Sequence, residues 1–364
     1  MKNILITNAD AHTFPSTYYS LRKEFDCDIL SSSRQEFCPN GFLTDSHVSF
    51  FNVTDDVYAP SILNFCVEHD VDVIVPLSIH ERLILLSLKD KFSEKGISII
   101  SVDAEKIHLA NDKLAFARVC EANGIPVPRY EVVSTYLELK SAAKRMGYPK
   151  NKVIIKPVVG SGSRGFRILN AKVNYKTTFY SSRPDQLVEV KLSSLKGTLG
   201  DTFSQPLIVN EFLCGNEFTV DCLCYADQEV IIPRERLETK NGLTDVGQVV
   251  KHDEIIAYTR KLVSILEIKG IFGFQFKLDS NGVPKMLECN PRIQGTMIMS
   301  TLAGANIIAE AVRRARGLEP RSFEVDWGMM FYRINSGFSI GKDIQIMNIV
   351  KKGQIEDNVG DLDK

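Results

Sequence analysis

The feature that most constrains the fold is an alternation of apolar and helical stretches in the first hundred residues. Five short apolar runs are typical of buried strands, at residues 2–7, 27–30, 48–51, 71–77 and 97–101. Helical stretches lie between them, at residues 16–25, 60–69 and 80–95. Strands and helices that alternate at these lengths predict an α/β fold with a parallel, doubly wound sheet.

The turn after the first strand has no G-x-G-x-x-G pattern, so a dinucleotide site is not predicted there. The carboxyl ends of parallel strands can still hold a small ligand. Asp10, His12, Ser78 and Glu81 are candidates by position alone, although solvated loop residues are the commoner explanation for such side chains.

Composition excludes several classes of protein. The chain has 364 residues, enough for two or three domains, and 44 basic against 45 acidic residues give a formal net charge of -1. This balance predicts no nucleic-acid partner and no anionic membrane surface. No apolar run approaches the roughly 20 residues that span a bilayer, and no signal peptide is expected. Eight scattered cysteines without a C-x-x-C pair favour free thiols in the cytoplasm.

A second region begins at Asn111-Asp112-Lys113, which opens a helix that runs to about Asn123. The glycine and prolines at residues 124–128 indicate a domain boundary. An apolar strand at residues 153–156 then ends in Lys156 and is followed by a glycine- and serine-rich loop. Small residues let backbone N–H groups approach phosphate oxygens, and a lysine supplies a point charge. The alternative is a hairpin with a solvent-facing lysine.

The stretch 207–221 is predicted as a strand, a break at Cys214-Gly215-Asn216 and a second strand. Glu211 follows an apolar run, as expected where a chain crosses between two lobes and its backbone meets an adenine edge. Glu217 falls where a ribose acceptor is useful, although exposed glutamates are common. Arg234 and Arg236 alternate on one strand face, which suits either a γ-phosphate or a substrate carboxylate, or simply solvent.

A hairpin is predicted from two apolar-alternating strands, at residues 271–278 and 284–289, with a turn at Asn281-Gly282. Gln275, Glu288 and Asn290 would then project toward one point. Three hard oxygen ligands beside a phosphate-binding arginine, Arg292, are what a nucleotide-held Mg²⁺ requires. The alternative is a surface hairpin with scattered polar residues. A helix is predicted to follow from about residue 296 to 316, ended by Gly317, and the tail from Lys351 is polar.

In this order the motifs resemble the ATP-grasp superfamily, and in particular one synthetase unit of the large subunit of carbamoyl-phosphate synthase. The matching stretches are NDKLAFARVCEANGIPVP, VIIKPVVGSGSRGF, VNEFLCGNEFTVD, GFQF and LECNPR. The resemblance implies a Rossmann-like pre-ATP-grasp domain followed by a two-lobed ATP-grasp domain of α+β character. The implied boundaries are 1–110, 111–215 for the linker helix and small lobe, 216–335 for the large lobe, and 336–364 for a C-terminal segment.

The resemblance also implies roles for individual residues. Lys113 and Lys156 resemble the two cations that contact the nucleotide phosphates. Arg234 resembles a basic residue near the transferred phosphate, and Arg292 resembles the phosphate-contacting arginine. The remaining roles fall to groups of residues. The mobile phosphate loop is implied at Gly160, Ser161, Gly162, Ser163 and Gly165. The adenine hinge is implied at Glu211, Phe212 and Leu213, ribose binding at Glu217, and metal binding at Gln275, Glu288 and Asn290.

The implied activity is an ADP-forming carboxylate–amine ligase that uses ATP with Mg²⁺, or Mn²⁺, and acts on small molecules. A homodimer is an expectation from the family only. The chain departs from carbamoyl-phosphate synthase by having one synthetase unit and by reading Ile293-Gln294-Gly295 where that enzyme has a further arginine. The alternatives are a bicarbonate-activating or carbamoyl-phosphate-type reaction, and a non-catalytic nucleotide-binding regulator. No Met-Lys-Met biotinylation signature is present.

Overall fold

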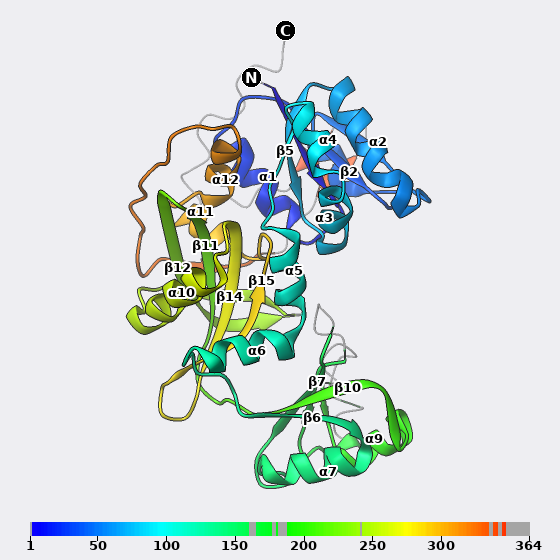
Figure 1. Cartoon of the computed structure of the whole chain (residues 1–364), viewed down its shortest axis with the longest axis vertical. Helices are drawn as coiled ribbons and strands as arrows, with labels where there is room; N and C mark the ends of the chain where they lie inside the picture. The colour runs from blue at the N-terminus through cyan, green and yellow to red at the C-terminus, as the bar shows by residue number, and fades with distance from the viewer. Residues whose placement is uncertain are drawn as a thin grey trace. The chain divides into compact units, whose positions relative to one another are not determined.

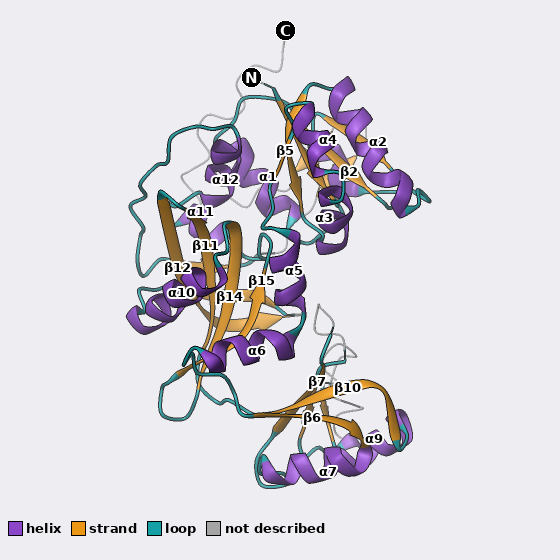
Figure 2. Ribbon diagram, in the orientation of Figure 1, coloured by secondary structure: helices purple, strands orange, loops and turns teal. Residues whose placement is uncertain are grey.

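The computed structural model describes residues 2–159, 165–176, 180, 188–240, 242–334, 338–340 and 344–346. Residues 1–331 form one compact unit, and Tyr332–Lys364 form a second. Within the first unit the chain builds three sheets with helices packed against them (Figures 1 and 2). The predicted boundaries at residues 110 and 215 stay a prediction; the first sheet lies before residue 110, the second between the two boundaries and the third after residue 215.

The N-terminal sheet is parallel throughout and has five strands in the order β3-β2-β1-β4-β5. Its strands are β1 (Asn3–Thr7), β2 (Ile29–Ser33), β3 (Ser46–Ser49), β4 (Val71–Pro76) and β5 (Ser98–Ile99). The chain moves outward from β1 to β3 and then restarts on the other side of β1 with β4. This confirms the predicted doubly wound α/β fold and creates a switch point between β1 and β4.

Both faces of this sheet are covered. Ile4 and Ile6 of β1 pack into a core with α1 (Phe14–Arg22) and α12 (Ile307–Ala315), whereas Leu5 packs on the opposite face. Alternate residues of a strand point to opposite faces, which explains this division. The opposite face is covered by three helices, α2 (Asp55–Glu68), α3 (Ile79–Leu86) and α4 (Lys89–Glu94), and a short 3₁₀ turn, η1 (Pro39–Leu43), precedes β3.

Two helices connect this sheet to the next region, α5 (Ala104–Asn111) and α6 (Lys113–Ala122). The side chain of Asp112 caps α6 by accepting the backbone N–H groups of Leu114 and Ala115, at 3.0 and 2.9 Å. The predicted helix start is therefore confirmed.

The second sheet has the order β6-β10-β7-β8-β9 and is antiparallel except for the β8–β9 pair. Its strands are β6 (Tyr130–Thr135), β7 (Val153–Pro157), β8 (Arg167–Leu169), β9 (Glu189–Val190) and β10 (Thr202–Glu211). Helices α7 (Tyr136–Arg145) and α9 (Leu192–Leu199) lie along one face, as Figure 2 shows, and share its apolar core.

The third sheet is antiparallel along its main strands, in the order β15-β14-β11-β12-β13-β16. Its strands are β11 (Glu217–Tyr225), β12 (Gln228–Lys240), β13 (Leu243–Val249), β14 (Gly270–Leu278), β15 (Pro284–Asn290) and β16 (Met330–Tyr332). Helix α10 (Asp253–Leu266) packs on it through a core that includes Phe272, Phe274 and Phe276.

Two predicted helices are each divided in the structure. The stretch 80–95 forms α3 and α4 with a break at Ser87-Leu88, for which the sequence has no glycine or proline signal. The predicted helix from about residue 296 to 316 forms α11 (Ile298–Leu302) and α12. Gly304 separates them with φ +98°, and a Cβ there would stand 2.5 Å from the Glu324 carbonyl oxygen. A positive φ and this close approach end the first helix.

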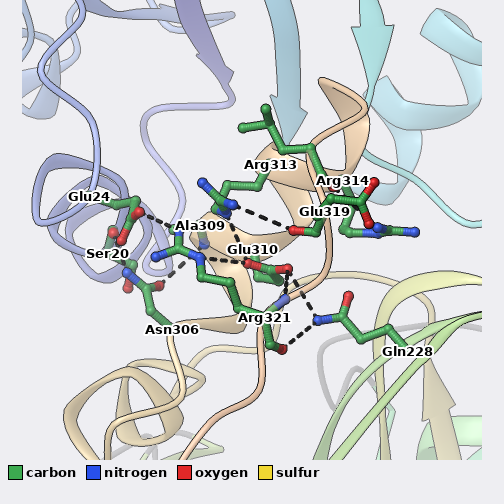
Figure 3. A network of polar contacts seen from close by, with 11 residues as sticks. Ser20, Glu24, Gln228, Asn306, Ala309, Glu310, Arg313, Arg314, Glu319 and Arg321 are labelled. Carbon is green, nitrogen blue, oxygen red and sulfur yellow. Dashed lines mark hydrogen bonds and ion pairs between the residues drawn. The ribbon is translucent and has the colours of Figure 1, made fainter.

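Helix α12 is anchored by a buried carboxylate, Glu310, which Figure 3 shows at the centre of a polar network. Its Oε1 accepts hydrogen bonds from Gln228 Nε2 at 3.1 Å and from the Arg321 backbone N–H at 3.0 Å. Its Oε2 pairs with Arg313 Nε at 3.2 Å and Arg321 Nε at 3.4 Å. Arg321 also pairs with Glu24. The network joins α12 to the β11–β12 hairpin, to the segment around residue 321 and to the chain just after α1.

In the second unit the described strands β17 (Phe338–Ile340) and β18 (Ile344–Ile346) pair antiparallel. The polar tail predicted from Lys351 lies outside the described residues. Among the residues that are described, no helix combines the length and apolar character needed to cross a membrane.

Candidate functional site

The predicted hairpin is formed by β14 and β15, and it brings the expected metal ligands together. Gln275 pairs directly with Glu288 across the two strands, and Asn290 pairs with Gly273 one step further. Asn290 Nδ2 donates to Glu288 Oε1 at 3.1 Å. All three oxygen-bearing side chains are only partly exposed. Carboxylate and amide oxygens gathered in this way fit a hard divalent cation that keeps several waters and phosphate ligands.

The absence of a side chain at Gly273 lets a neighbouring side chain cross β14 beside these residues. A Cβ on Gly273 would stand 1.2 Å from Gln294 Nε2 and 2.6 Å from the Val220 carbonyl oxygen. The Gln294 side chain crosses β14 at this point to donate to that carbonyl, at 2.9 Å. The chain after Arg292 is thereby fixed to β11, next to the β14–β15 hairpin.

Two lysines come from different elements to the same place. Lys113 begins α6 and Lys156 lies near the end of β7, and a bridge between Asp112 and Val159 holds these segments side by side. Desolvation lowers the pKa of Lys156, with Glu288 raising it and Lys113 lowering it further. The pKa of Lys113 is likewise lowered by desolvation and raised by Glu288. Lys113, Lys156 and Glu288 therefore form one electrostatic cluster.

Arg292 is the third cation of this cluster. Burial lowers its pKa, and the nearby Glu288 carboxylate raises it. Glu288 thus interacts with three partly buried cations, of which Lys113 also interacts with Asp112, and gathering buried charges of one sign is unfavourable unless counter-ions join them. The arrangement fits a bound polyanion.

Arg82 holds in place the loop that carries Arg292, and the sequence patterns did not identify it. It is fully buried, and its guanidinium donates to the carbonyl oxygen of Pro291 and to that of Pro76 at 2.6 Å. Burial and the neighbouring Arg292 charge lower the pKa of Arg82 to about 9. Arg82 therefore ties the Asn290–Arg292 loop to the end of β4.

The two chain segments that enter and leave the second sheet are joined at Glu211. Its backbone N–H donates to the Arg129 carbonyl at 3.0 Å, and its carboxylate accepts from the Arg129 backbone N–H at 2.9 Å and Nε at 2.8 Å. Phe212 follows with its ring 5.6 Å from Lys152 Nζ, and Leu213 is buried. The predicted crossing point is where the structure places it.

A family model described as "ATP-grasp in the biosynthetic pathway with Ter operon" matches residues 203–334. The carbamoyl phosphate synthase large chain of Clostridium acetobutylicum is 24% identical over 268 residues, which are 70% of this chain and 23% of that protein. The chain therefore spans about a quarter of this curated relative.

Solved structures share the fold at low identity. A biotin carboxylase from Campylobacter jejuni in a β,γ-ATP complex superposes with a TM-score of 0.64 at 17% identity, over 89% of this chain and 73% of that one. N5-carboxyaminoimidazole synthetase from Staphylococcus aureus complexed with ADP gives 0.62 at 16% identity, over 89% and 80%. Residues 203–334 therefore match an ATP-grasp family model, and the chain shares its fold with these two structures. The predicted resemblance and the predicted fold are confirmed.

In the stretch that matches the family model, Glu217 is already engaged by two cations. Its Oε1 pairs with Arg236, and its Oε2 lies 3.4 Å from Lys277 Nζ. A ribose hydroxyl would share this carboxylate with two cations, so ribose binding by Glu217 stays a prediction.

Arg234 lies in an environment that argues against the expected phosphate contact. It is fully buried, and its Nε and Nη2 each lie 2.7 Å from the carboxylate of Asp221. Its Nη1 donates to Thr296 Oγ1 at 2.8 Å, and Ser300 Oγ donates to Asp221 at 2.6 Å. The N–H groups of Arg234 are thus already bonded to Asp221 and Thr296. Arg234 is better described as a positioning residue that connects β12 to β11 and to the segment that leads into α11.

The predicted phosphate loop, Gly160 to Ser163, lies outside the described residues. Gly165, at its far end, is described and has φ +73°, and a Cβ there would stand 2.7 Å from Pro157 Cγ. A residue with a side chain is strained at such a φ, so glycine suits this end of the loop.

Proposed function

We propose that the chain is an ATP- and Mg²⁺-dependent ligase that activates a carboxylate as an acylphosphate for attack by an amine, releasing ADP and phosphate. The observation that carries the proposal is the cluster of Lys113, Lys156 and Arg292 around Glu288. Positive charge from three different elements of the chain gathers at this carboxylate, and the triphosphate of ATP has the charge and the oxygens to bind there.

In the proposed reaction a carboxylate oxygen attacks the γ-phosphorus of ATP, and the bond to the β–γ bridging oxygen breaks to release ADP. The amine nitrogen then attacks the acyl carbon, loses a proton, and phosphate departs. Catalysis of phosphoryl transfer is mainly positioning and charge neutralisation. Lys156 and Arg292 contribute by holding the phosphate oxygens, and Lys113 by contacting the same chain of phosphates from α6.

Gln275, Glu288 and Asn290 are the residues that would hold Mg²⁺. The bound ion supplies charge neutralisation at the phosphate oxygens. The hydrogen bond from Asn290 to Glu288 orients the carboxylate, and Arg82 holds the loop on which Arg292 stands.

Adenine recognition is proposed at the hinge, through the backbone of Glu211 and Leu213 with Phe212 between them. Because Arg129 engages both the carboxylate and the backbone N–H of Glu211, we propose that Glu211 meets the base edge through its backbone carbonyl. This division of roles supports a nucleotide held at the crossing point, with its phosphates directed toward Lys156.

The test is release of ADP from ATP and Mg²⁺ in the presence of pooled amino acids and small carboxylic acids, with product masses recorded. Glu288→Gln removes the charge but keeps the shape, and we expect ADP release to fall by about 100-fold or more. Glu229→Gln, at the other end of the same sheet where Glu229 pairs with Arg260 at the surface, is the matched control and should leave the rate unchanged.

The outcomes separate the alternatives. A product mass equal to an acid plus an amine minus water supports the ligase. ADP release that depends on bicarbonate alone would favour the carboxylase-type or carbamoyl-phosphate-type reaction. Tight ATP binding without turnover from any pool would favour a nucleotide-binding regulator, and equal rates for Glu288→Gln and the parent protein would remove the metal assignment.

A further inference from the structure

A partly open cavity of about 580 Å³ lies between the second sheet and α9. Its described walls come from the end of β7, the start of β8, the first half of β10 and the second half of α9. Pockets that bind small molecules usually have volumes of about 300–1,000 Å³. The cavity therefore has the size of a ligand site.

The cavity lies on the reverse face of the strand that carries Lys156. Alternate residues of a strand point to opposite faces, and Ile155 of β7 belongs to the apolar core shared with α7 and α9. Ile155 and Pro157 both line the cavity, so the side chain of Lys156 between them points to the other side of the sheet, where it interacts with Lys113 and Glu288. A ligand in the cavity can thus contact β7 without entering the proposed nucleotide site.

One charged side chain interrupts the apolar face that lines the cavity. Arg167 pairs directly with Ile155 across β7 and β8, so the two side chains lie on the same face of the sheet. The next residue of β8 on this face, Leu169, is fully buried in the core. An arginine therefore lies where the neighbouring positions are apolar, and it lines the cavity.

Arg167 keeps most of its hydrogen-bonding capacity in this position. Its Nη1 donates to the carbonyl oxygen of Phe166 at 2.7 Å, and it forms no ion pair with any residue that the structure describes. The described lining contains no acidic side chain, whereas Thr198, Thr202 and Gln205 add hydroxyl and amide groups. A guanidinium has five N–H donors in a planar fork, so donors remain for a carboxylate.

We propose that this cavity binds a small carboxylate with an apolar body, and that this ligand is an effector of nucleotide binding. The carboxylate pairs with Arg167, and the apolar body packs against Ile155, Leu195 and Leu207, which are at most 7% exposed. Charge and shape both select the ligand. A cation is repelled by the guanidinium, and an acid without an apolar body leaves most of the cavity unfilled.

The cavity also contacts both sides of the predicted phosphate loop. Pro157 precedes that loop and Gly165 ends it, and a Cβ on Gly165 would stand 2.7 Å from Pro157 Cγ, so the two residues pack closely. The backbone N–H of Val158 donates to the Pro206 carbonyl at 3.2 Å, between two β10 residues that line the cavity. A ligand that packs here therefore acts on the strand end that carries Lys156.

The effector role rests on the nucleotide site of the proposed function. If ATP binds at Lys156, the carboxylate and ATP contact opposite faces of the same strand. Linkage then requires each ligand to change the dissociation constant of the other by the same factor.

The test uses the full chain and four probes at equal ionic strength: phenylbutyrate, phenylbutanol, phenylbutylammonium and acetate. In calorimetry phenylbutyrate should bind at one site per chain, about 10-fold or more tightly than each of the other three, because only it combines the apolar body with a charge-assisted pair. Equal affinities for phenylbutyrate and phenylbutanol would show that Arg167 does not hold the ligand. Either that result or an absence of phenylbutyrate binding would overturn the proposal.

Variants locate the bound probe. Arg167→Met should weaken phenylbutyrate binding to the level of phenylbutanol, whereas Arg145→Met, on α7 outside the lining, is the matched control and should leave it unchanged. Thr198→Trp places a large side chain at an exposed position of the lining and should block binding, and Ser193→Trp, on the same helix but outside the lining, should not. Full phenylbutyrate binding in either cavity variant would refute the assignment.

Nucleotide titrations test the effector role. Saturating phenylbutyrate should change the dissociation constant of ATP with Mg²⁺ by about 5-fold or more, a typical size for coupling between two sites. Arg167→Met should remove the change and leave ATP binding otherwise intact. An ATP affinity that phenylbutyrate does not alter would overturn the effector role.

A further variant separates this proposal from the ligase proposal. Glu288→Gln should lose ADP release yet still bind phenylbutyrate, since Glu288 does not line the cavity. Phenylbutyrate binding through Arg167 in a chain that releases no ADP from any pool would retain the cavity site and remove the ligase. ADP release with an acid and an amine, but without phenylbutyrate binding, would retain the ligase and remove the cavity site.

Discussion

Replacing Arg234 by Met tests whether this residue contacts phosphate or positions the lobe. The change removes the bonds from the guanidinium to Asp221 and Thr296 and leaves the fully buried Asp221 carboxylate with only Ser300 as a donor. Removing one partner of a buried ion pair costs about 3–5 kcal/mol, since the other charge remains uncompensated. The structure therefore predicts a large loss of stability from a side chain that no solvent touches.

Two companion variants allow the coupling energy between Arg234 and Asp221 to be measured. Asp221→Leu alone should cost a similar 3–5 kcal/mol, because it leaves the guanidinium buried and unpaired. The double variant replaces both charges by apolar groups, and only Ser300 and Thr296 lose a partner, at about 1 kcal/mol each. We expect the double variant to cost about 2 kcal/mol in total, far less than the two single changes added together.

Urea unfolding followed by the fluorescence of Trp327, the only tryptophan, is the assay. Gly328 beside it donates to the Val249 carbonyl at 2.7 Å, so the signal reports on the third sheet. With a slope of about 3 kcal/mol per molar urea, the midpoint of Arg234→Met should fall by about 1–2 M. Arg260→Met, which breaks a surface pair with Glu229, is the control and should cost less than about 1 kcal/mol. An Arg234→Met protein with an unchanged midpoint and no ADP release would refute the positioning role and restore the phosphate contact.

Two further predictions concern the stability of the ligand-free protein. Lys156→Met should raise its thermal midpoint while weakening ATP binding in calorimetry. Because the folded-state pKa of Lys156 is lowered, the cost of its charge is full at pH values below that pKa, decreases as the pH rises through it, and disappears above the pKa of the unfolded chain, so the advantage of the variant should shrink in that direction. An advantage that grows with pH would contradict this sign. Glu310→Ala should lower the free energy of unfolding by about 3 kcal/mol, since it leaves Arg313 and the Arg321 backbone N–H without their buried acceptor. Glu319→Ala, in the neighbouring segment, should change the unfolding free energy little, and equal losses for the two variants would rule out the network as the cause.

Sequence patterns predicted best those features that depend on residues close together in the chain. The hairpin of β14 and β15 was predictable because alternating apolar residues fix two strands and Asn281-Gly282 favours the turn. That pairing alone places Gln275 opposite Glu288. The start of α6 was equally readable, since an aspartate before a helical stretch is a good cap.

Contacts between segments that are far apart in the sequence could not be predicted in this way. The alternation of Arg234 and Arg236 correctly indicated one strand face, but it could not show that the acceptors on that face are Asp221 and Glu217 of the neighbouring strand. Arg82 was missed because its main partner, the Pro291 carbonyl, is 209 residues away. Nothing near residue 82 distinguishes a buried arginine from one that faces solvent.

The first turn of α3 contributes two buried charged residues in succession. Glu81 contacts the Thr7 and Tyr58 hydroxyls, whereas Arg82 contacts the loop that holds Arg292. Successive helical residues are about a quarter-turn apart or slightly more, so one short helix can serve both directions. Arg82 is therefore the contact through which the end of β4 and the first turn of α3 hold the loop that carries Arg292.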